Sequence, residues 1–374
     1  MAPQQQLINR LSTFSISIPL LILFISTVFL LFFSSNDDVA AIWPQCSPTT
    51  PTGFLSHVSR IPLIGQPLCF LISFFEYAMA SSRGFAVMSV VLSFVGALLT
   101  VSTIESARIY NSPNFLIRNP TLPWLFFNLA GGAVAWQIII VPAFISRSRR
   151  AHHIQSSASP RFLSEGNPSS TGQSASSPEV IDARDPNRGS EKHHLRSSAE
   201  IYAIPLSIII GYVVPCTVML FATSPTSVAI WLFFPLWVSL ARQAIRYILI
   251  LLPIFPQFTN DESDTHHIES FNFSLTVVYA VPVLLSILSQ VIIFNNLLDA
   301  DDGSPVTRAA LGFIEIDFSA IALTVFYLLL LEAGWKIFGI ALVCCVISGP
   351  GTGLVVGWIM REKMKEVDTT NSRD

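Results

Sequence analysis

Charged residues are scarce in this chain, where Asp, Glu, Lys and Arg make up only 12% of 374 residues. A soluble domain carries about 25%, so half of the usual charged surface is missing. Apolar residues account for 51%, and the mean hydropathy is +0.58. This composition excludes a single soluble globule of this size and predicts a polytopic membrane protein.

The sequence also lacks the motifs of common soluble enzymes. It has no P-loop, no GxGxxG at a strand-to-helix turn and no HExxH. The net charge of −3, without a long basic stripe, argues against nucleic acid as a partner. The five cysteines have no metal-ligand spacing, and four lie in or beside apolar runs. Such cysteines usually pack as small apolar side chains, so we expect neither a metal site nor a disulfide framework.

Long apolar runs are what the sequence has instead. A helix needs about 20 apolar residues to cross a bilayer, and nine runs approach that length. One of them, 61–80, contains two prolines and Glu76 and could be re-entrant rather than spanning. We therefore predict an all-α, polytopic transmembrane helical bundle with 8–9 helices. The runs are 13–33, 61–80, 84–104, 122–145, 200–222, 226–253, 273–294, 311–332 and 335–360.

The polar gaps between these runs divide the chain into five parts. Residues 146–199 form a Ser/Pro-rich loop with eight Lys and Arg, which predicts disorder and a cytosolic location. If all nine runs crossed, the basic tail would fall in the lumen, so either one run does not cross or the tail departs from the positive-inside rule. The parts are 1–60 (anchor helix and lumenal Pro-rich segment), 61–145 and 200–360 (two membrane helix groups), 146–199 (the loop) and 361–374 (polar tail).

Ionisable residues in or beside the runs are the first site candidates, because each costs about 2.5–3.5 kcal/mol at a helix centre. Glu105 and Arg108, three residues apart, share a helix face, either as an interfacial ion pair or as a carboxylate at a cavity mouth. Arg242 and Arg246, one turn apart, point to the same side. They require an internal partner such as Glu76 or an anionic or phenolic ligand.

The eighth run opens with Glu315 and Asp317, where the helix dipole favours carboxylates. Glu332, four residues before Lys336, is a second possible partner for the two arginines or forms a salt bridge across Gly334. Aromatic residues such as Trp231 are abundant, and an inward-facing minority would suit a cation in the bundle.

Five short strings lie along the chain: FLIRNP at 115–120, NLAGG at 128–132, AIP at 203–205, GYVVP at 211–215 and WLFFPLW at 231–237. Together they resemble the integral-membrane terpene cyclases of fungal meroterpenoid pathways. The resemblance is greatest to the longer group, which includes the ascochlorin and ascofuranone cyclases, and spans about residues 60–360. The loop at 146–199 and the extra first helix depart from the shorter, pyripyropene-type group.

The resemblance implies an isomerase- or lyase-type enzyme of secondary metabolism in the endoplasmic reticulum membrane. In such a reaction a carboxylic acid protonates a terminal epoxide or alkene of a prenylated aromatic or polyketide substrate. An internal alkene or hydroxyl attacks the cation, and a base removes the last proton. No diphosphate leaves, so we expect no metal and no other cofactor. The expected partners are the hydrophobic prenylated substrate, the lipid bilayer and other enzymes of the pathway.

The expected topology suggests which residues act. If Glu105, Glu315 and Asp317 all lie at the lumenal ends of their helices, they meet at one level. We therefore predict Glu105 and Asp317 as the catalytic pair, with Glu315 in reserve. For substrate binding we predict Arg108, Arg242, Arg246 and Trp231.

An alternative function is a polytopic small-molecule transporter or lipid-binding membrane protein. Kinking prolines and arginines inside a membrane helix fit that hypothesis too. The absence of an internal repeat in the sequence counts against it.

Overall fold

The computed structural model describes residues 13–33, 42–46, 54–108, 111, 114–146, 195, 199–251, 272–298 and 302–371. Within these residues the chain is helical, and its only β pairing is an isolated bridge between Arg108 and Leu195. The predicted all-α polytopic bundle is therefore confirmed. The predicted disordered loop at 146–199 lies almost entirely outside the described residues.

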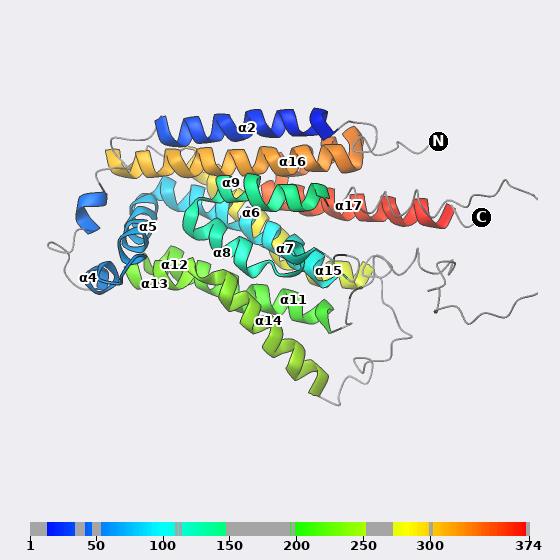
Figure 1. Ribbon diagram of the computed structural model, residues 1–374, viewed down its shortest axis with the longest axis horizontal. Helices are drawn as coiled ribbons and strands as arrows, with labels where there is room; N and C mark the ends of the chain where they lie inside the picture. The colour runs from blue at the N-terminus through cyan, green and yellow to red at the C-terminus, as the bar shows by residue number, and fades with distance from the viewer. Residues whose placement is uncertain are drawn as a thin grey trace, which may run out of the picture.

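Six long helical stretches run along the bundle (Figure 1). All except α2 are long and apolar enough to cross a membrane, and the 21 residues of α2 span about 32 Å, close to a bilayer core. The stretches are α2 (Thr13–Phe33), α6 (Ser82–Ala107), α11 to α12 (Glu200–Ile208, η6 Ile209–Val213, Val214–Ala222), α14 (Phe234–Leu251), α15 (Asn272–Asn296) and the first part of α16 (Pro305–Ser348).

Local hydrogen bonds explain where α6 and α16 begin. Ser81 and Ser304 each accept a backbone N–H three residues later, at 2.9 and 3.1 Å, which satisfies a donor at the helix start. Asp302 joins the two helix starts, because its Oδ2 accepts the Ser82 N–H at 3.1 Å. The two helices therefore start at the same end of the bundle and run parallel.

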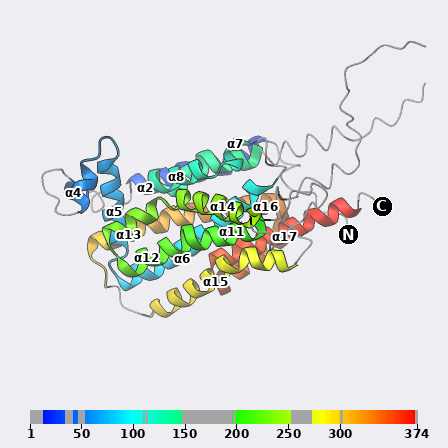
Figure 2. The same cartoon turned by 90° about the horizontal axis from the view of Figure 1, so that it is seen from below.

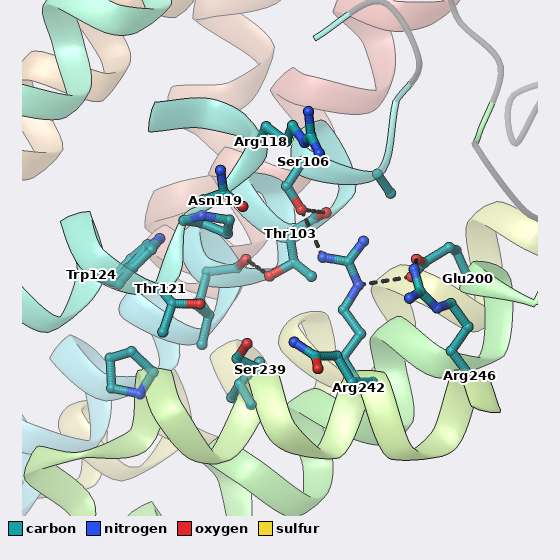
Figure 3. A pocket seen from close by; sticks show the side chains of 16 residues that line it. Thr103, Ser106, Arg118, Asn119, Thr121, Trp124, Glu200, Ser239, Arg242 and Arg246 are labelled. Atoms are coloured by element: carbon teal, nitrogen blue, oxygen red, sulfur yellow. Dashed lines mark hydrogen bonds and ion pairs between the residues drawn. The ribbon is translucent and has the colours of Figure 1, made fainter. Parts of the chain in front are cut away.

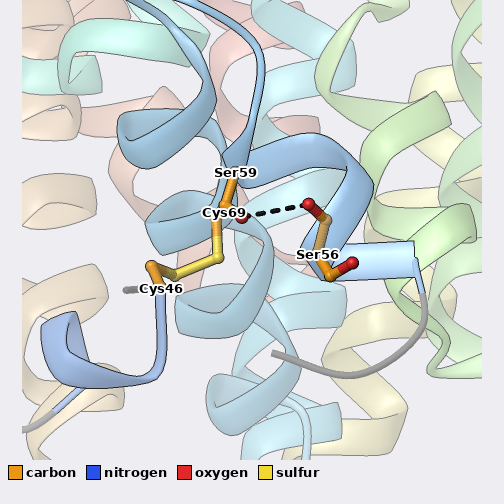
Figure 4. Close-up of a disulfide and its surroundings, with 4 residues drawn as sticks. All are labelled: Cys46, Ser56, Ser59 and Cys69. Atoms are coloured by element: carbon orange, nitrogen blue, oxygen red, sulfur yellow. Dashed lines mark hydrogen bonds between the residues drawn. A yellow bond between two sulfur atoms is a disulfide. The ribbon is translucent and has the colours of Figure 1, made fainter. Parts of the chain in front are cut away.

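A disulfide marks this end of the bundle, which we call the disulfide end. Cys46 in η1 (Trp43–Cys46) bonds to Cys69 in α5 (Gly65–Ala78), with a Cα–Cα distance of 5.8 Å (Figure 4). The expectation of no disulfide is wrong. Both helices pack against α4 (Phe54–Ser59), α5 also packs against α13 (Pro225–Leu232), and the run 61–80 contributes the 14-residue α5.

The run 122–145 folds as a helical hairpin. Its legs are α8 (Thr121–Ala130) and the helix Gly132–Ser146, which begins with α9 (Gly132–Ala135) and η3 (Trp136–Ile140). The chain reverses at Gly131, whose φ of +107° is accessible mainly to glycine. At the tip, the Ala133 N–H donates to Asp317 Oδ1 at 2.8 Å. Because Asp317 lies near the middle of 305–333, this hairpin reaches about half the depth of the bundle.

The run 335–360 forms a second hairpin. Helix α16 breaks at Gly334, and 335–348 turns back along the bundle before a second reversal at Gly349 (φ +91°) opens α17 (Pro350–Asn371). Ser286, near the middle of α15, meets this tip, where its Oγ accepts the Thr352 N–H at 2.9 Å. The second hairpin therefore also ends at mid-depth.

Both hairpins open at the end opposite the disulfide, which we call the arginine end. At this end a hydrogen bond joins the segment that enters the first hairpin to the helix that leaves it, because Asn114 Nδ2 donates to the Ala143 carbonyl at 3.2 Å. Short α7 (Phe115–Arg118) lies at the same end. Figure 2 shows α4 and α5 at one end and the end of α17 at the other.

Candidate functional site

A cavity of about 230 Å³ lies at the arginine end between α6, α8, α11 and α14 (Figure 3). Its inner wall is partly apolar, with Trp124, Pro235 and Val238. The rest of the lining is unusually polar for a membrane bundle. The polar and charged residues are Thr103, Ser106, Arg118, Asn119, Thr121, Glu200, Ser239, Arg242, Gln243 and Arg246.

An ion pair between α11 and α14 forms the charged wall of this cavity. Arg242 Nε donates to Glu200 Oε2 at 2.8 Å, and Arg246 Nη1 lies 3.6 Å from Glu200 Oε1. Arg242 also donates to Ser106 Oγ at 2.7 Å. The two helices come this close because a Cβ on Gly211 would meet the Val238 backbone at 2.4 Å.

This pairing corrects the expected partners of the two arginines. Neither Glu76 nor Glu332 provides the carboxylate, because α14 packs on α11 rather than on α16. Glu200, at the first position of α11, was absent from our candidates. Its signal in the sequence is weak, since a glutamate in a first helical turn is ordinary helix chemistry.

A second group of charges lies buried at the same end, outside the cavity. Glu105 accepts Asn111 Nδ2 at 2.8 Å and lies 3.8 Å from Arg108 Nε. Arg108 in turn reaches Glu362 Oε2 at 3.1 Å, and Glu362 Oε1 accepts from Arg361 at 2.6 Å. These charges tie α17 to the end of α6.

Glu332 completes this group by pairing with Arg361, whose guanidinium also lies 4.2 Å from the Trp358 ring centroid. Each of these side chains is at least nine-tenths buried. Breaking one partner of a buried pair costs about 3–5 kcal/mol. The arrangement therefore favours the structural interpretation of Glu105 and Arg108, an ion pair at the helix end.

The expected meeting of three carboxylates at one level is wrong. Helices α6 and α16 run parallel from the disulfide end, so Glu105 at the end of α6 lies at the level of Glu332 at the end of the first part of α16, where both pair with Arg361. Asp317 lies about halfway along that part and contacts the tip of the first hairpin instead. Glu315 is exposed on the outer face of α16.

Asp317 faces a crowded, largely apolar point in the bundle. A Cβ on Gly132 would lie 2.6 Å from Asp317 Oδ2, 3.1 Å from Phe127 Cζ and 3.2 Å from Ile321 Cδ1. Only a glycine leaves room for these three groups to converge. Among the described residues Asp317 has one hydrogen bond from the protein, the Ala133 N–H.

Two aromatic rings of α8 lie on the side of the cavity that leads toward Asp317. The Trp124 ring, on the cavity wall, lies 4.8 Å from that of Phe127, whose Cζ converges on Gly132 together with the Asp317 carboxyl. Trp231 is buried elsewhere, with its ring 4.9 Å from that of Phe75 toward the disulfide end. It therefore does not line the cavity, whereas Trp124, which we did not predict as a binding residue, does.

Comparison with known proteins identifies the family to which the chain belongs. A family model described as CtvD domain matches residues 14–300, which is most of the chain. The chain belongs to the CtvD family. This family is associated with meroterpenoid gene clusters, which is consistent with a role of the chain in a meroterpenoid pathway. No curated protein and no solved structure matches it.

The CtvD match covers the cavity but not every candidate. Glu200, Arg242 and Arg246 lie inside the matched residues, whereas Asp317 and Arg361 follow them. Within the described part of the chain, no three His, Cys, Asp or Glu residues are grouped as metal ligands. The chemistry that these side chains can provide is proton transfer at Asp317 and binding of charge in the cavity.

Proposed function

We propose that this CtvD-family protein is a membrane-bound terpene cyclase of meroterpenoid biosynthesis. It starts ring closure by protonating the terminal epoxide or alkene of a prenylated aromatic or polyketide substrate. The family association supports the pathway. The helical bundle supports a reaction inside the membrane, where such a substrate dissolves.

One observation carries the proposal, which is the position of Asp317. Its carboxyl lies at half depth among apolar side chains and faces Phe127 across Gly132. A general acid for an epoxide needs a proton to give in a site from which water is excluded. An aromatic ring beside it stabilises the carbocation that follows.

The distance between the cavity and Asp317 suits an extended prenyl chain. Thr121, the first residue of the ten-residue α8, lines the cavity, and Gly131, directly after α8, forms the hairpin tip. At 1.5 Å per residue this separation is about 15 Å. We propose that the aromatic head binds in the cavity and that the chain follows α8 past Trp124 and Phe127.

The proton balance needs only this carboxyl. Asp317 gives its proton to the epoxide oxygen, the C–O bond breaks, and an internal alkene or hydroxyl forms the new bond. The resulting carboxylate takes the proton released by the attacking hydroxyl or by the last carbon. No diphosphate departs, so no metal enters the proposed sequence.

The direct test compares two carboxyl variants of the full-length protein in microsomes. The substrate is a farnesylated phenol with a terminal epoxide, and the product is followed by mass spectrometry. Asp317→Asn is expected to slow cyclisation by about 10²- to 10⁴-fold, the usual contribution of a general acid. Glu315→Gln is the matched control, because its exposed carboxyl lies two residues away on the same helix. Both assays are run with and without chelator.

Two outcomes would contradict the proposal. Wild-type cyclisation by Asp317→Asn, at equal protein amount, would remove the assigned acid. Loss of activity in chelator with recovery on adding Mg²⁺ would favour an enzyme that ionises a diphosphate.

We also propose an endoplasmic reticulum location, with the disulfide end in the lumen. Disulfides persist in that oxidising compartment, and basic residues collect on the cytosolic side. The cavity arginines, Arg108 and Arg361 all lie at the arginine end. Protease added to intact microsomes should then cleave within 146–199, and protection of that loop would reverse the orientation.

Transport of a small molecule is a second candidate function, favoured by the two hairpins. Broken helices whose N-termini meet polar groups at mid-membrane are typical of secondary transporters, and Ala133 donates to Asp317 in this way. Proteoliposomes discriminate between the two functions. A transporter moves the prenylated phenol unchanged, whereas a cyclase yields an isomer with a new retention time.

A further inference from the structure

The cavity walls carry an excess of positive charge. Three arginines, Arg118, Arg242 and Arg246, line it together with one carboxylate, Glu200. Glu200 balances one of them, so two positive charges remain in the wall. We infer that the cavity binds an anionic oxygen group, a carboxylate or phenolate, on the aromatic head of the substrate. This inference rests on the proposed function, because it takes the cavity as the head-group site.

The arginines differ in how firmly they are held. Glu200 and Ser106 fix the guanidinium of Arg242 at the wall with bonds of 2.8 and 2.7 Å. Arg246 lies farther from Glu200, at 3.6 Å, and 42% of its side chain is exposed (Figure 3). Arg118, at the mouth, is exposed as well. Two adaptable guanidinium groups beside a fixed one suit a planar carboxylate, which accepts two parallel N–H bonds.

The volume indicates which part of the substrate enters. A cavity of about 230 Å³ equals roughly eight water molecules at 30 Å³ each. Sites that enclose a whole drug-sized ligand measure about 300–1,000 Å³. The space therefore suits one substituted ring, with Trp124 and Pro120 as flat apolar walls beside the charged ones. The prenyl chain has to lie outside it.

The test measures binding without turnover. Full-length protein carrying Asp317→Asn is placed in phosphatidylcholine nanodiscs at pH 6.5. The probes are 3-farnesyl-4-hydroxybenzoic acid and its methyl ester, which share the ring and the farnesyl chain but differ in charge and by one methyl group. We expect the acid to bind about 10- to 100-fold more tightly than the ester, as hydrogen bonds between charged groups usually add. Raising the pH through the pKa of the ester's phenol should tighten the ester if phenolate is also accepted.

Three further variants, one of them a control, test which positive charges bind the anionic group. Arg246→Gln and Arg118→Gln are expected to reduce the preference for the acid to less than threefold, because each weakens binding of the acid more than binding of the ester. Both side chains are exposed, so both variants should fold. Lys363→Gln is the control, because it removes an exposed positive charge at the same end without touching the cavity.

Two results would overturn the inference. Equal affinities for acid and ester would show that binding in the cavity does not depend on the charge of the ligand. Loss of acid binding in nanodiscs with phosphatidylserine, relieved by Arg246→Gln, would make the cavity a lipid head-group site. Preferential acid binding without cyclised product from the wild type would leave the inference standing and contradict only the proposed function.

Discussion

Replacing the glycine at the tip of the second hairpin tests whether this hairpin ends at half the depth of the bundle. Gly349 has φ +91° and ψ 158°, a conformation that costs other residues about 1–3 kcal/mol. An added Cβ would also lie 2.6 Å from the Ser286 carbonyl oxygen, and a backbone atom cannot move aside. Overpacking of this kind adds about 1–3 kcal/mol. We expect Gly349→Ala to destabilise the protein by about 2–6 kcal/mol in total.

Two other glycines provide the comparison. Gly131 has φ +107° but open space around it, so Gly131→Ala should cost only the strain of about 1–3 kcal/mol. Gly312 is helical with open space, and Gly312→Ala should be neutral or stabilising by up to about 1 kcal/mol. Apparent melting temperatures in detergent, followed by size-exclusion fluorescence, should rank Gly349→Ala lowest and Gly131→Ala next. A Gly349→Ala protein as stable as the wild type would refute the second hairpin.

Three further predictions concern the contacts at the two ends. Arg242→Gln leaves Glu200 buried with only the distant Arg246, so purified protein should lose up to about 3–5 kcal/mol of stability and regain part of it when Glu200→Gln is added. Reduction, or Cys69→Ser, should lower the melting temperature by the equivalent of about 3 kcal/mol for a loop of this length, and mass-tag alkylation should react with Cys69 only after reduction. Hydrogen bonds from Ser82 lower the pKa of Asp302 below its ordinary value of 3.8. The stabilising contribution of this carboxylate is therefore complete above pH 3.8 and is lost as the pH falls through the lowered pKa. Thermal stability below about pH 4 should accordingly fall less steeply in Asp302→Asn than in the wild type.

Composition and apolar run length predicted the bundle, but run length alone could not predict the hairpins. A run of 24 or 26 apolar residues, such as 122–145 or 335–360, has the hydropathy of a spanning helix whether or not it reverses. The difference lies in single glycines at the tips. Gly131-Gly132 and Gly349-Pro350 divide the apolar residues of these runs into stretches of about 9–14, too short to cross a bilayer, and α17 continues beyond its apolar stretch as a polar helix to Asn371. Their positions in mid-run were the available signal.

The partners of charged residues were harder to predict than the residues themselves. Arg242 required a carboxylate, and the sequence offered several at similar distances from the membrane surface. The choice of Glu200 depends on α11 packing against α14, which Gly211 permits and no periodicity reveals. Cys46 and Cys69 likewise look like packing cysteines until η1 folds back on α5.

The hairpins also explain on which side of the bundle the positively charged tail lies. With nine full crossings, Arg361, Lys363 and Lys365 in the second half of α17 would lie on the side opposite the loop at 146–199. A hairpin at 335–360 returns Arg361 to Glu332, at the end where α16 left it. The tail then follows at the arginine end, and the positive-inside rule holds for loop and tail together.

The cost of charge in a membrane explains why the proposed head-group site and the proposed acid lie at different depths. An arginine near the end of a helix keeps its guanidinium close to the interface and loses little hydration, so a cavity for an anion is least costly at the arginine end. A carboxyl at half depth has no such access, and Asp317 lies where a hairpin brings a backbone N–H to it. An amphiphilic substrate has the same polarity, with its charged head at the interface and its chain inward. The bundle therefore favours one orientation of the substrate, the one that carries the far end of the chain to the acid.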